Sequence, residues 1–437
     1  MVRFESLNSG YGATKALSTV DTLVSRHTGE ISIAIHTLST NMLSHSDKLT
    51  DDFDEQQVQY ALEVLKIAGL IRRDLTFFEE KTRDRLRMLM GRMSAAIDEE
   101  CNVKSAVANS SNKAWSQIPD TLSAAEIESI FSMSVCSEAG DDEGSSKSPS
   151  ILVLQRLATP DKLGKKAILF PEAMDSIARL VKSCQSFVFD ICAALPMKHL
   201  DGMSSLAVWK QEESMWSSSA PDSYGTLPQS HITQVGEHML ALVQALEPFA
   251  SDKDALSLAN LVMEGVERVA FEPWKAFIDA IDCDGVSNEE FINALMKGQA
   301  IKDLVINHES MQNLDEEEDM EDEEDSETHA FCNKWLDAVC TAVTGRLLDR
   351  TMRIHRLSKK GGDHLTVDFN YIVNVFSALG VSGHPHPLLS HIAEITSMDS
   401  AALENRFSIS NTDDLSPLAK AVRNTEVRIA LMKGVTL

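Results

Sequence analysis

The spacing of apolar residues is the feature that most limits the fold of this chain. In ITQVGEHMLALVQALEPF, residues 232–249, apolar side chains recur at alternating intervals of three and four. They are Ile232, Val235, Met239, Leu242, Leu246 and Phe249, with Leu240 and Val243 widening the stripe. This period places them on one face of an α-helix, with Gln and Glu elsewhere. An amphipathic helix is predicted, with Thr226 and Pro228 near its start and Pro248 near its end.

The same period recurs along most of the chain. Two helices are predicted in the first hundred residues, the second over about 55–99, and another runs between Pro171 and Pro196, which fit a helix start and stop. Further helices are predicted at 254–280, 289–307, 331–357, 366–380, 387–398 and 418–435, the fourth of these ending in Gly380 as a C-terminal cap. No segment shows the clear period-two alternation of a strand, so the predicted fold class is all-α.

Polar segments divide these helices into regions. A chain of 437 residues is long enough for two or three packed units. Ser-, Gly- and Asp-rich sequence cannot bury enough apolar surface to offset its chain entropy, which predicts a flexible linker. The predicted regions are an N-terminal helical segment at 1–104, the linker at 105–150, a helical segment at 151–216 and C-terminal helical bundles at 226–437. An acidic insertion, DEEEDMEDEEDSE at 315–327, is expected to stay extended through charge repulsion.

The charge of the chain excludes one large class of partner. With 66 acidic and 40 basic residues the formal net charge is −26, which repels nucleic-acid phosphates, so no nucleic acid is expected to bind. Short basic patches at 83–87 and Lys359–Lys360 are more typical of a solvated helix face or loop than of a membrane contact. The longest apolar run, FVFDICAAL at 187–195, is interrupted by Asp190. Membrane association is therefore expected to be peripheral or through partners.

The cysteines indicate a reducing compartment. Their number is odd, they are widely scattered, and no secretory leader is recognised. They are Cys101, Cys136, Cys184, Cys192, Cys283, Cys332 and Cys340. Reduced thiols in the cytosol fit this pattern best, and the pairs that lie eight residues apart are expected to be buried core residues.

Motifs for metal or phosphate binding are incomplete. In DAIDCDGVSNEEF, residues 279–291, placing Gly285 at the turn of a calcium loop puts Ala280 and Phe291 at the first and twelfth ligand positions. A turn between helices is therefore favoured. LGKKA at 163–167 lacks the preceding glycine of a phosphate loop and ends in alanine where Ser or Thr would hold magnesium, so no phosphate loop is predicted.

Two further features leave alternatives open. His384 and His386 in GHPHP could form a chance metal pair, although a connector is favoured. The acidic insertion could attract a basic partner or accept phosphorylation at Ser326, although most such runs are solvated. No nucleophile motif of the GxSxG type occurs. The sequence thus predicts no catalytic, cofactor-binding or metal-binding residue, no cofactor and no enzyme activity.

Four collinear blocks resemble one family. LPQSHITQVGEHMLALVQALEPF is similar to a signature of subunit seven of the conserved oligomeric Golgi complex, a vesicle-tethering assembly. NKWLDAVCTAV at 333–343, VDFNYIVNVFSALG at 367–380 and FPEAMDSIARLVKSCQSFVFDIC at 170–192 resemble the same family. The resemblance runs from about residue 170 to the C-terminus, and the acidic insertion departs from the family pattern.

The resemblance implies a fold and a function together. It implies an elongated rod of stacked antiparallel helical bundles, of the kind found in multisubunit tethers. It further implies a non-enzymatic subunit acting in intra-Golgi retrograde vesicle transport, in retention of glycosylation enzymes and in Golgi organisation. Subunits five, six and eight of the complex are the implied neighbours, with SNARE and Rab proteins as further candidate partners. The implied location is the cytosolic face of the Golgi membrane, held peripherally through partners.

Two functions from other classes remain as alternatives. One is a generic cytosolic α-helical adaptor with no Golgi role, which a diffuse distribution in cells would favour. The other is an enzyme on an all-helical fold with a cofactor between helices, which stoichiometric metal or bound nucleotide would favour. The amphipathic helices fit all three functions, whereas the four blocks favour the tether.

Overall fold

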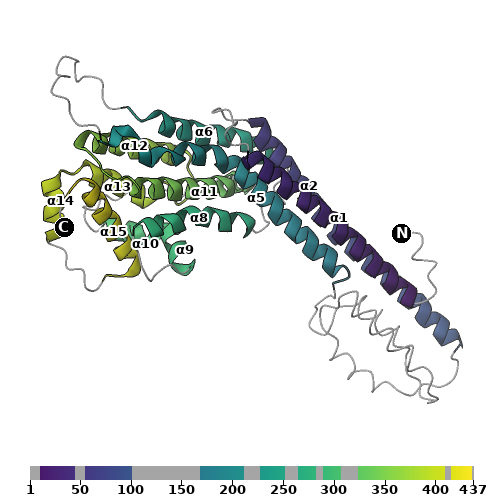
Figure 1. Cartoon of the computed structure of the whole chain (residues 1–437). Helices are drawn as coiled ribbons and strands as arrows, with labels where there is room; N and C mark the ends of the chain where they lie inside the picture. Colours follow the sequence, from purple (N-terminus) through teal and green to yellow (C-terminus); the bar gives the residue numbers. More distant parts are fainter. Residues whose placement is uncertain are drawn as a thin grey trace. The chain divides into compact units, whose positions relative to one another are not determined.

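The described part of the chain is helical throughout. The computed structural model describes residues 10–44, 55–100, 168–210, 227–250, 264–281, 289–306, 323–408 and 415–435. Within these ranges every regular element is an α-helix or a short 3-10 helix, and no strand occurs (Figure 1). The all-α prediction is therefore confirmed. The predicted linker at 105–150 and LGKKA at 163–167 lie outside the described residues, and the predicted region boundaries stay predictions.

The chain divides into two compact units, each held together by contacts among its own residues. Unit 1 consists of Met1–Thr37 and Ile67–Cys184, and unit 2 of Leu38–Lys66 and Gln185–Leu437. Three long helices contribute residues to both units: α1 (Gly10–Ser44), α2 (Glu55–Glu100) and α5 (Pro171–Asp201). The two helices predicted in the first hundred residues are thus confirmed as α1 and α2.

The described part of unit 1 consists of α1 up to Thr37, α2 from Ile67 onward and the first half of α5. The buried carboxylate of Asp21 on α1 accepts a hydrogen bond of 2.7 Å from the backbone N–H of Ala173, in the first turn of α5. The carboxylate of Glu79 on α2 accepts one of 3.0 Å from the N–H of Leu169, just before that helix. Unpaired N–H groups at a helix start need such acceptors. The start of α5 is therefore capped by side chains of the two other helices, and Pro171 occupies its first position.

Unit 2 contains the remaining helices, several of which run alongside one another in Figure 1. They are η4 (Met203–Ser205), η5 (Ala207–Lys210), α6 (Ser230–Ala250), α8 (Glu264–Ala280), α9 (Glu289–Lys297), α10 (Gln299–Ile306), α11 (Glu323–Met352), α12 (Lys359–Ala378), α13 (Pro387–Ser397), α14 (Ser400–Ser408) and α15 (Pro417–Met432). Helix α11 packs on both α8 and α6, and α12 packs on α13 and α6. Six residues of the apolar stripe predicted for 232–249 are buried against these neighbours, whereas Val243 is half-buried and Leu240 is exposed.

The start of α6 depends on α12. The carboxylate of Asp368 accepts hydrogen bonds from the backbone N–H and the side-chain amide of Gln229, both at 2.8 Å. Nearly two turns into the helix, a Cβ on Gly236 would lie 2.6 Å from the ring of Tyr371. Only glycine lets the two helices approach this closely. Two of the sequence blocks described above, separated by more than a hundred residues, therefore meet in the core of unit 2.

Pro196 does not end its helix as predicted, because the helix α5 continues to Asp201. Proline has no N–H, so the carbonyl of Cys192 one turn earlier loses its helical donor. In the structure that carbonyl lies 2.8 Å from Nε2 of His238, a buried side chain on α6. A tertiary hydrogen bond thus replaces the lost helical one, which explains why the helix tolerates the proline.

Other predicted boundaries also shift. The helix predicted at 289–307 is two helices, α9 and α10, since Gly298 between them has φ of 66° and a Cβ there would lie 2.9 Å from the ring of His386. The helix predicted at 331–357 ends at Met352, and residues 353–358 form a connector to α12. Gly380, with φ of 65°, follows α12 as the predicted cap.

Part of the acidic insertion is helical. Residues 315–322 lie outside the described part, but 323–327 form the first turns of α11, so the predicted extended conformation is wrong for them. Negative charge is favourable at a helix N-terminus because it interacts with the helix dipole. This interaction favours continuing the helix into acidic sequence that like-charge repulsion alone would keep extended.

One described helical stretch is long and apolar enough to cross a membrane. It is Pro171–Lys210, with a mean hydropathy of 1.2, and 61% of its apolar window is buried inside the protein. Its Asp190 accepts a hydrogen bond of 3.0 Å from the hydroxyl of Ser39, and burial raises the pKa of this carboxyl. Such burial and side-chain pairing are typical of a core helix in a folded protein.

Candidate functional site

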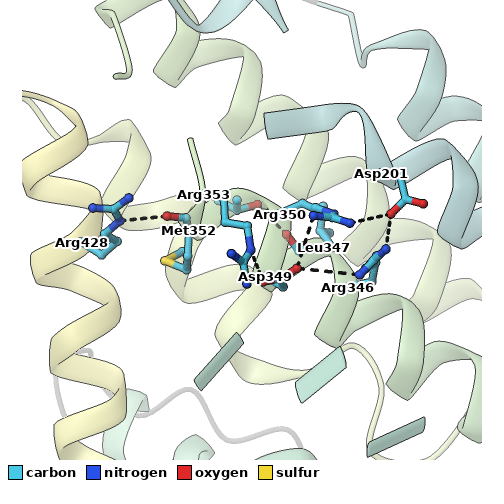
Figure 2. Close-up of polar contacts among 9 residues, drawn as sticks. Asp201, Arg346, Leu347, Asp349, Arg350, Met352, Arg353 and Arg428 are labelled. Atoms are coloured by element: carbon cyan, nitrogen blue, oxygen red, sulfur yellow. Dashed lines mark hydrogen bonds and ion pairs between the residues drawn. The ribbon is translucent and has the colours of Figure 1, made fainter. Parts of the chain in front are cut away.

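A polar network of unit 2 lies at the C-terminal end of α11 (Figure 2). Arg346, Arg350 and Arg353 recur at intervals of four and three residues, which places their guanidinium groups on one side of the helix. Asp349 lies among them with 2% of its side chain exposed. Positive charge near a helix C-terminus is favourable because the carbonyl groups there carry partial negative charge. This end of the helix is therefore an energetically favourable place for the three arginines.

Asp349 is the centre of this network. Its Oδ1 accepts a hydrogen bond of 2.6 Å from Nε of Arg353, and its Oδ2 lies 3.9 Å from a guanidinium nitrogen of both Arg346 and Arg350. A buried carboxylate without such partners would be strongly destabilising. Three arginines thus compensate the burial of one aspartate.

The same arginines tie α11 to α5. Asp201, the last residue of α5, accepts hydrogen bonds through Oδ1 from Arg346 and, at 2.8 Å, from Arg350 (Figure 2). A third helix joins because Nε of Arg428 on α15 donates to the Met352 carbonyl at 2.8 Å, which satisfies a carbonyl left without a helical donor. The network therefore joins the ends of α5 and α11 and one face of α15.

This geometry is suited to holding helices in place. A catalytic centre needs a nucleophile beside a base, or an acid and a base with their pKa values pushed apart. The hydroxyl nearest the network, on Thr351, donates to the Leu347 carbonyl of its own helix at 2.7 Å. In the described ranges no group of three or more His, Cys, Asp or Glu side chains is arranged to hold a metal ion.

The two histidines of GHPHP, His384 and His386, contact different partners. His386 is buried, its Nδ1 accepts from the N–H of Leu388 at 3.2 Å, and its Nε2 lies 2.9 Å from the Leu295 carbonyl. Burial lowers the pKa of His386 to about 4, so the ring is neutral and Nε2 carries the proton. His384 instead lies 3.0 Å from the carboxylate of Asp337. The two rings therefore belong to a connector between α12 and α13, the alternative that the sequence favours.

Three of the four described cysteines are buried in the core, as predicted. Cys184, Cys192 and Cys340 are buried, Cys332 is half-buried, and all four are free thiols. Burial raises the pKa of Cys184 and of Cys192 to about 12 and that of Cys332 to about 11, so none is a thiolate at neutral pH. In the calcium-loop candidate, Phe291 packs into the core and residues 282–288 lie outside the described part.

A second charged cluster joins α13, α14 and α15. The carboxylate of Glu426 contacts Nε2 of His391 at 3.1 Å, and it accepts hydrogen bonds from Arg406 at 2.8 Å and Arg423 at 3.1 Å. Burial alone would raise the pKa of Glu426, but the His391 hydrogen bond and the two arginines outweigh it and lower the pKa to about 2. The cluster is ionic at neutral pH and connects three helices.

Neither charged cluster was predicted from the sequence. Helical spacing would have shown that Arg346, Arg350 and Arg353 share a face, but not that Asp201 lies opposite. Arg406 and Glu426 are twenty residues apart on different helices, so no local spacing relates them. The signal for the first cluster was an aspartate within an otherwise apolar and basic helical segment.

The described residues form an all-helical protein in which clusters of polar side chains hold helices together. Its candidate binding surfaces are the exposed faces of these helices. The family model described as Golgi complex component 7 (COG7) matches residues 3–271. The chain therefore belongs to this family. The match includes the first hundred residues, which the sequence blocks left out, and it ends before the blocks at 333–343 and 367–380. Residues 170–271 are common to the match and to the resemblance.

A curated relative agrees with the family. The conserved oligomeric Golgi complex subunit 7 of Arabidopsis thaliana is 22% identical over 211 residues, which is 48% of this chain and 18% of that protein. The chain thus aligns with less than a fifth of the relative's length. No solved structure matches the chain.

Proposed function

We propose that this protein is a non-enzymatic subunit of the Golgi vesicle-tethering complex. In this proposal it acts in intra-Golgi retrograde vesicle transport, and thereby in Golgi organisation and the retention of glycosylation enzymes. The observation that carries the proposal is the family match over residues 3–271, which is more than half of the chain. The relative named above supports it, since that protein is itself named as a subunit of the complex.

The helix faces of unit 1 support assembly with other chains. Large apolar side chains are exposed on α1 and on α2: Leu23, Ile31, Ile33, Ile67, Phe77 and Met88. The exposed fraction reaches 69% for Ile33 and 56% for Phe77. Single exposed apolar residues are normal, but several of them along two long helices leave apolar area that further packing can bury. We propose that helices of sister subunits, with subunits five, six and eight as the first candidates, cover these faces.

The helix lengths support an elongated arrangement. With 35 and 46 residues, α1 and α2 would measure about 50 and 70 Å at 1.5 Å per residue. Helices of this length are suited to a rod of stacked antiparallel bundles. The proposed location is peripheral, on the cytosolic face of the Golgi membrane, with SNARE and Rab proteins as further partners.

Co-purification tests the assembly directly. A tagged full-length chain should recover sister subunits of the complex from cells that produce it. The double substitution Ile33→Ser and Phe77→Ser should reduce that recovery, whereas Leu227→Ser with Leu240→Ser, exposed apolar residues of unit 2, should leave it unchanged. Recovery of the wild-type chain as an isolated monomer would contradict the proposal.

Localisation separates this proposal from a general adaptor. A fluorescent fusion of the full chain should concentrate at the Golgi. Depletion of the protein from cells should alter the glycans of secreted proteins. Diffuse fluorescence together with normal glycans would instead favour an adaptor without a Golgi role.

A further inference from the structure

An exposed basic surface surrounds the connector between α11 and α12. It is formed by Lys210, Arg353, His355, Arg356, Lys359 and Lys360 and is called here the connector surface. Two contacts bring its parts together: the N–H of Ser358 donates to the Trp209 carbonyl at 2.7 Å, and a Cβ on Gly361 would lie 2.6 Å from the same carbonyl oxygen. Lys210 of η5 therefore lies beside the first turn of α12, which carries the two other lysines.

The connector surface opposes the charge of the rest of the chain. The chain as a whole carries −26, yet the stretch from Arg353 to Lys360 contains four Lys or Arg residues and no acidic one. Asp349, the acidic residue just before it, is nearly buried and is bound by Arg353. Among the described residues, Asp363, exposed on the next turn of α12, is an adjoining negative charge, and in the sequence Glu212 and Glu213 follow Lys210 outside the described part. At physiological salt the Debye length is about 8 Å, so a nearby anionic surface responds to this local charge more than to distant acidic residues.

The lysines of this surface form no polar contact with other described residues. Lys210, Lys359 and Lys360 make no hydrogen bond or ion pair in the described structure. By contrast, Arg346 and Arg423 are held by carboxylates. Lysines in the first turn of a helix are also unfavourable, because the N-terminal end already carries partial positive charge. Folding therefore does not explain their presence at the start of α12.

An apolar side chain lies close to these charges. The N–H of Leu357 in the connector donates to the Met432 carbonyl at 2.8 Å, which holds the end of α15 against the connector. The neighbouring Leu431 is 49% exposed. Basic residues beside an exposed apolar side chain are typical of surfaces that adsorb to anionic lipid headgroups.

We propose that the connector surface binds an anionic lipid bilayer directly. The unpaired cations are lysines, which act as point charges and interact with many headgroups at once, whereas specific recognition of one acidic peptide favours the planar fork of arginine. Both arginines of the surface already have partners within the protein. The inference deepens the proposed function. It rests on that function only for the identity of the membrane that the protein contacts.

Vesicle co-sedimentation of the full chain tests this contact. The wild-type chain should sediment with phosphatidylcholine vesicles that contain phosphatidylserine, should stay in solution with phosphatidylcholine alone, and should be released by added salt. Each lysine near an anionic surface contributes roughly fivefold to binding, so Lys359→Gln with Lys360→Gln should reduce the partition coefficient about 30-fold. The matched control is Lys275→Gln with Lys297→Gln, two exposed lysines on α8 and α9 that likewise make no ion pair.

Three results would overturn the inference. The first is absence of wild-type binding to the anionic vesicles. The second is an equal loss in the test and control variants, which would assign binding to total charge. The third is binding to soluble poly-glutamate but not to vesicles, which would assign the surface to an acidic protein. If the test variant melts at the same temperature as the wild type, unfolding is excluded as the cause of a loss of vesicle binding.

The test is independent of the proposed assembly. The Lys359→Gln and Lys360→Gln variant should still co-purify with sister subunits as the wild type does. Co-purification without vesicle binding would refute only the membrane contact. Vesicle binding without co-purification would refute the proposed assembly and leave the membrane contact standing.

Discussion

Unit 1 and unit 2 use the same helical period with different results. In unit 2 the stripe of α6 is enclosed, and Leu242 and Leu246 have no exposed surface. In unit 1 the helices α1 and α2 bury one face yet leave large residues such as Ile33 and Phe77 in solvent. The difference shows that an amphipathic pattern identifies a helix but not its partner. The main stripe of α6 is enclosed by other helices of unit 2, whereas α1 and α2 in unit 1 retain apolar surface that another chain could cover.

The enclosed stripe of α6 should show the largest effect. Leu242→Ala with Leu246→Ala removes two fully buried side chains, and each such truncation costs about 2–5 kcal/mol, so the free energy of unfolding should fall by about 4–10 kcal/mol. Denaturant titration measures the change. Leu240→Ala on the same helix, with 45% of its side chain exposed, is the control and should cost less than about 1 kcal/mol. Similar losses for both variants would refute the contrast between enclosed and open faces.

The Glu426 cluster should make unit 2 sensitive to acid. The pKa of Glu426 in the folded protein is about 2, below its unfolded value of about 4.5, so the ionised form stabilises the fold. About 3 kcal/mol of stability is present above pH 4.5 and should be lost as the pH falls through the range from about 4.5 to about 2. Unfolding free energies measured across that range test the loss, and Glu426→Gln should remove this part of the pH dependence.

The hydrogen bond at Pro196 can be tested by rescue. His238→Phe leaves the buried Cys192 carbonyl without its donor, which should cost about 1–3 kcal/mol. Pro196→Ala restores a backbone N–H to the same carbonyl, so the double variant should recover much of that loss. Additive losses in a double-mutant cycle would show that His238 stabilises the fold in another way.

The open faces of unit 1 should show the smallest effect on stability. Ile33→Ser with Phe77→Ser removes exposed side chains, so the unfolding free energy of the isolated chain should change by less than about 0.5 kcal/mol per site. Thermal melting of the purified variant is the measurement. A large loss would mean that these faces are packed within the chain, which would remove the difference between the two units.

Local patterns predicted the helices because the apolar period and the caps depend on residues that are close together in the sequence. Gly380 follows α12 as expected, and α2 spans Glu55–Glu100 where a helix over about 55–99 was predicted. The predicted helix boundaries were wrong where a residue distant in the sequence determines the local structure. Pro196 stays inside its helix because His238 supplies a donor, and Arg428 satisfies the carbonyl at Met352 where α11 ends. The ion clusters were missed for the same reason, since Asp201 and Arg346 are 145 residues apart.

The capping of α6 by Asp368 has a consequence for biosynthesis. Gln229 leaves the ribosome 139 residues before its partner, which corresponds to on the order of ten seconds of translation. During that interval the first turn of α6 has no acceptor from α12, and the apolar stripe behind it has no cover from that helix. A nascent chain stalled before Asp368 should therefore be a strong substrate for chaperones and proteases, and release of the stall should end that vulnerability.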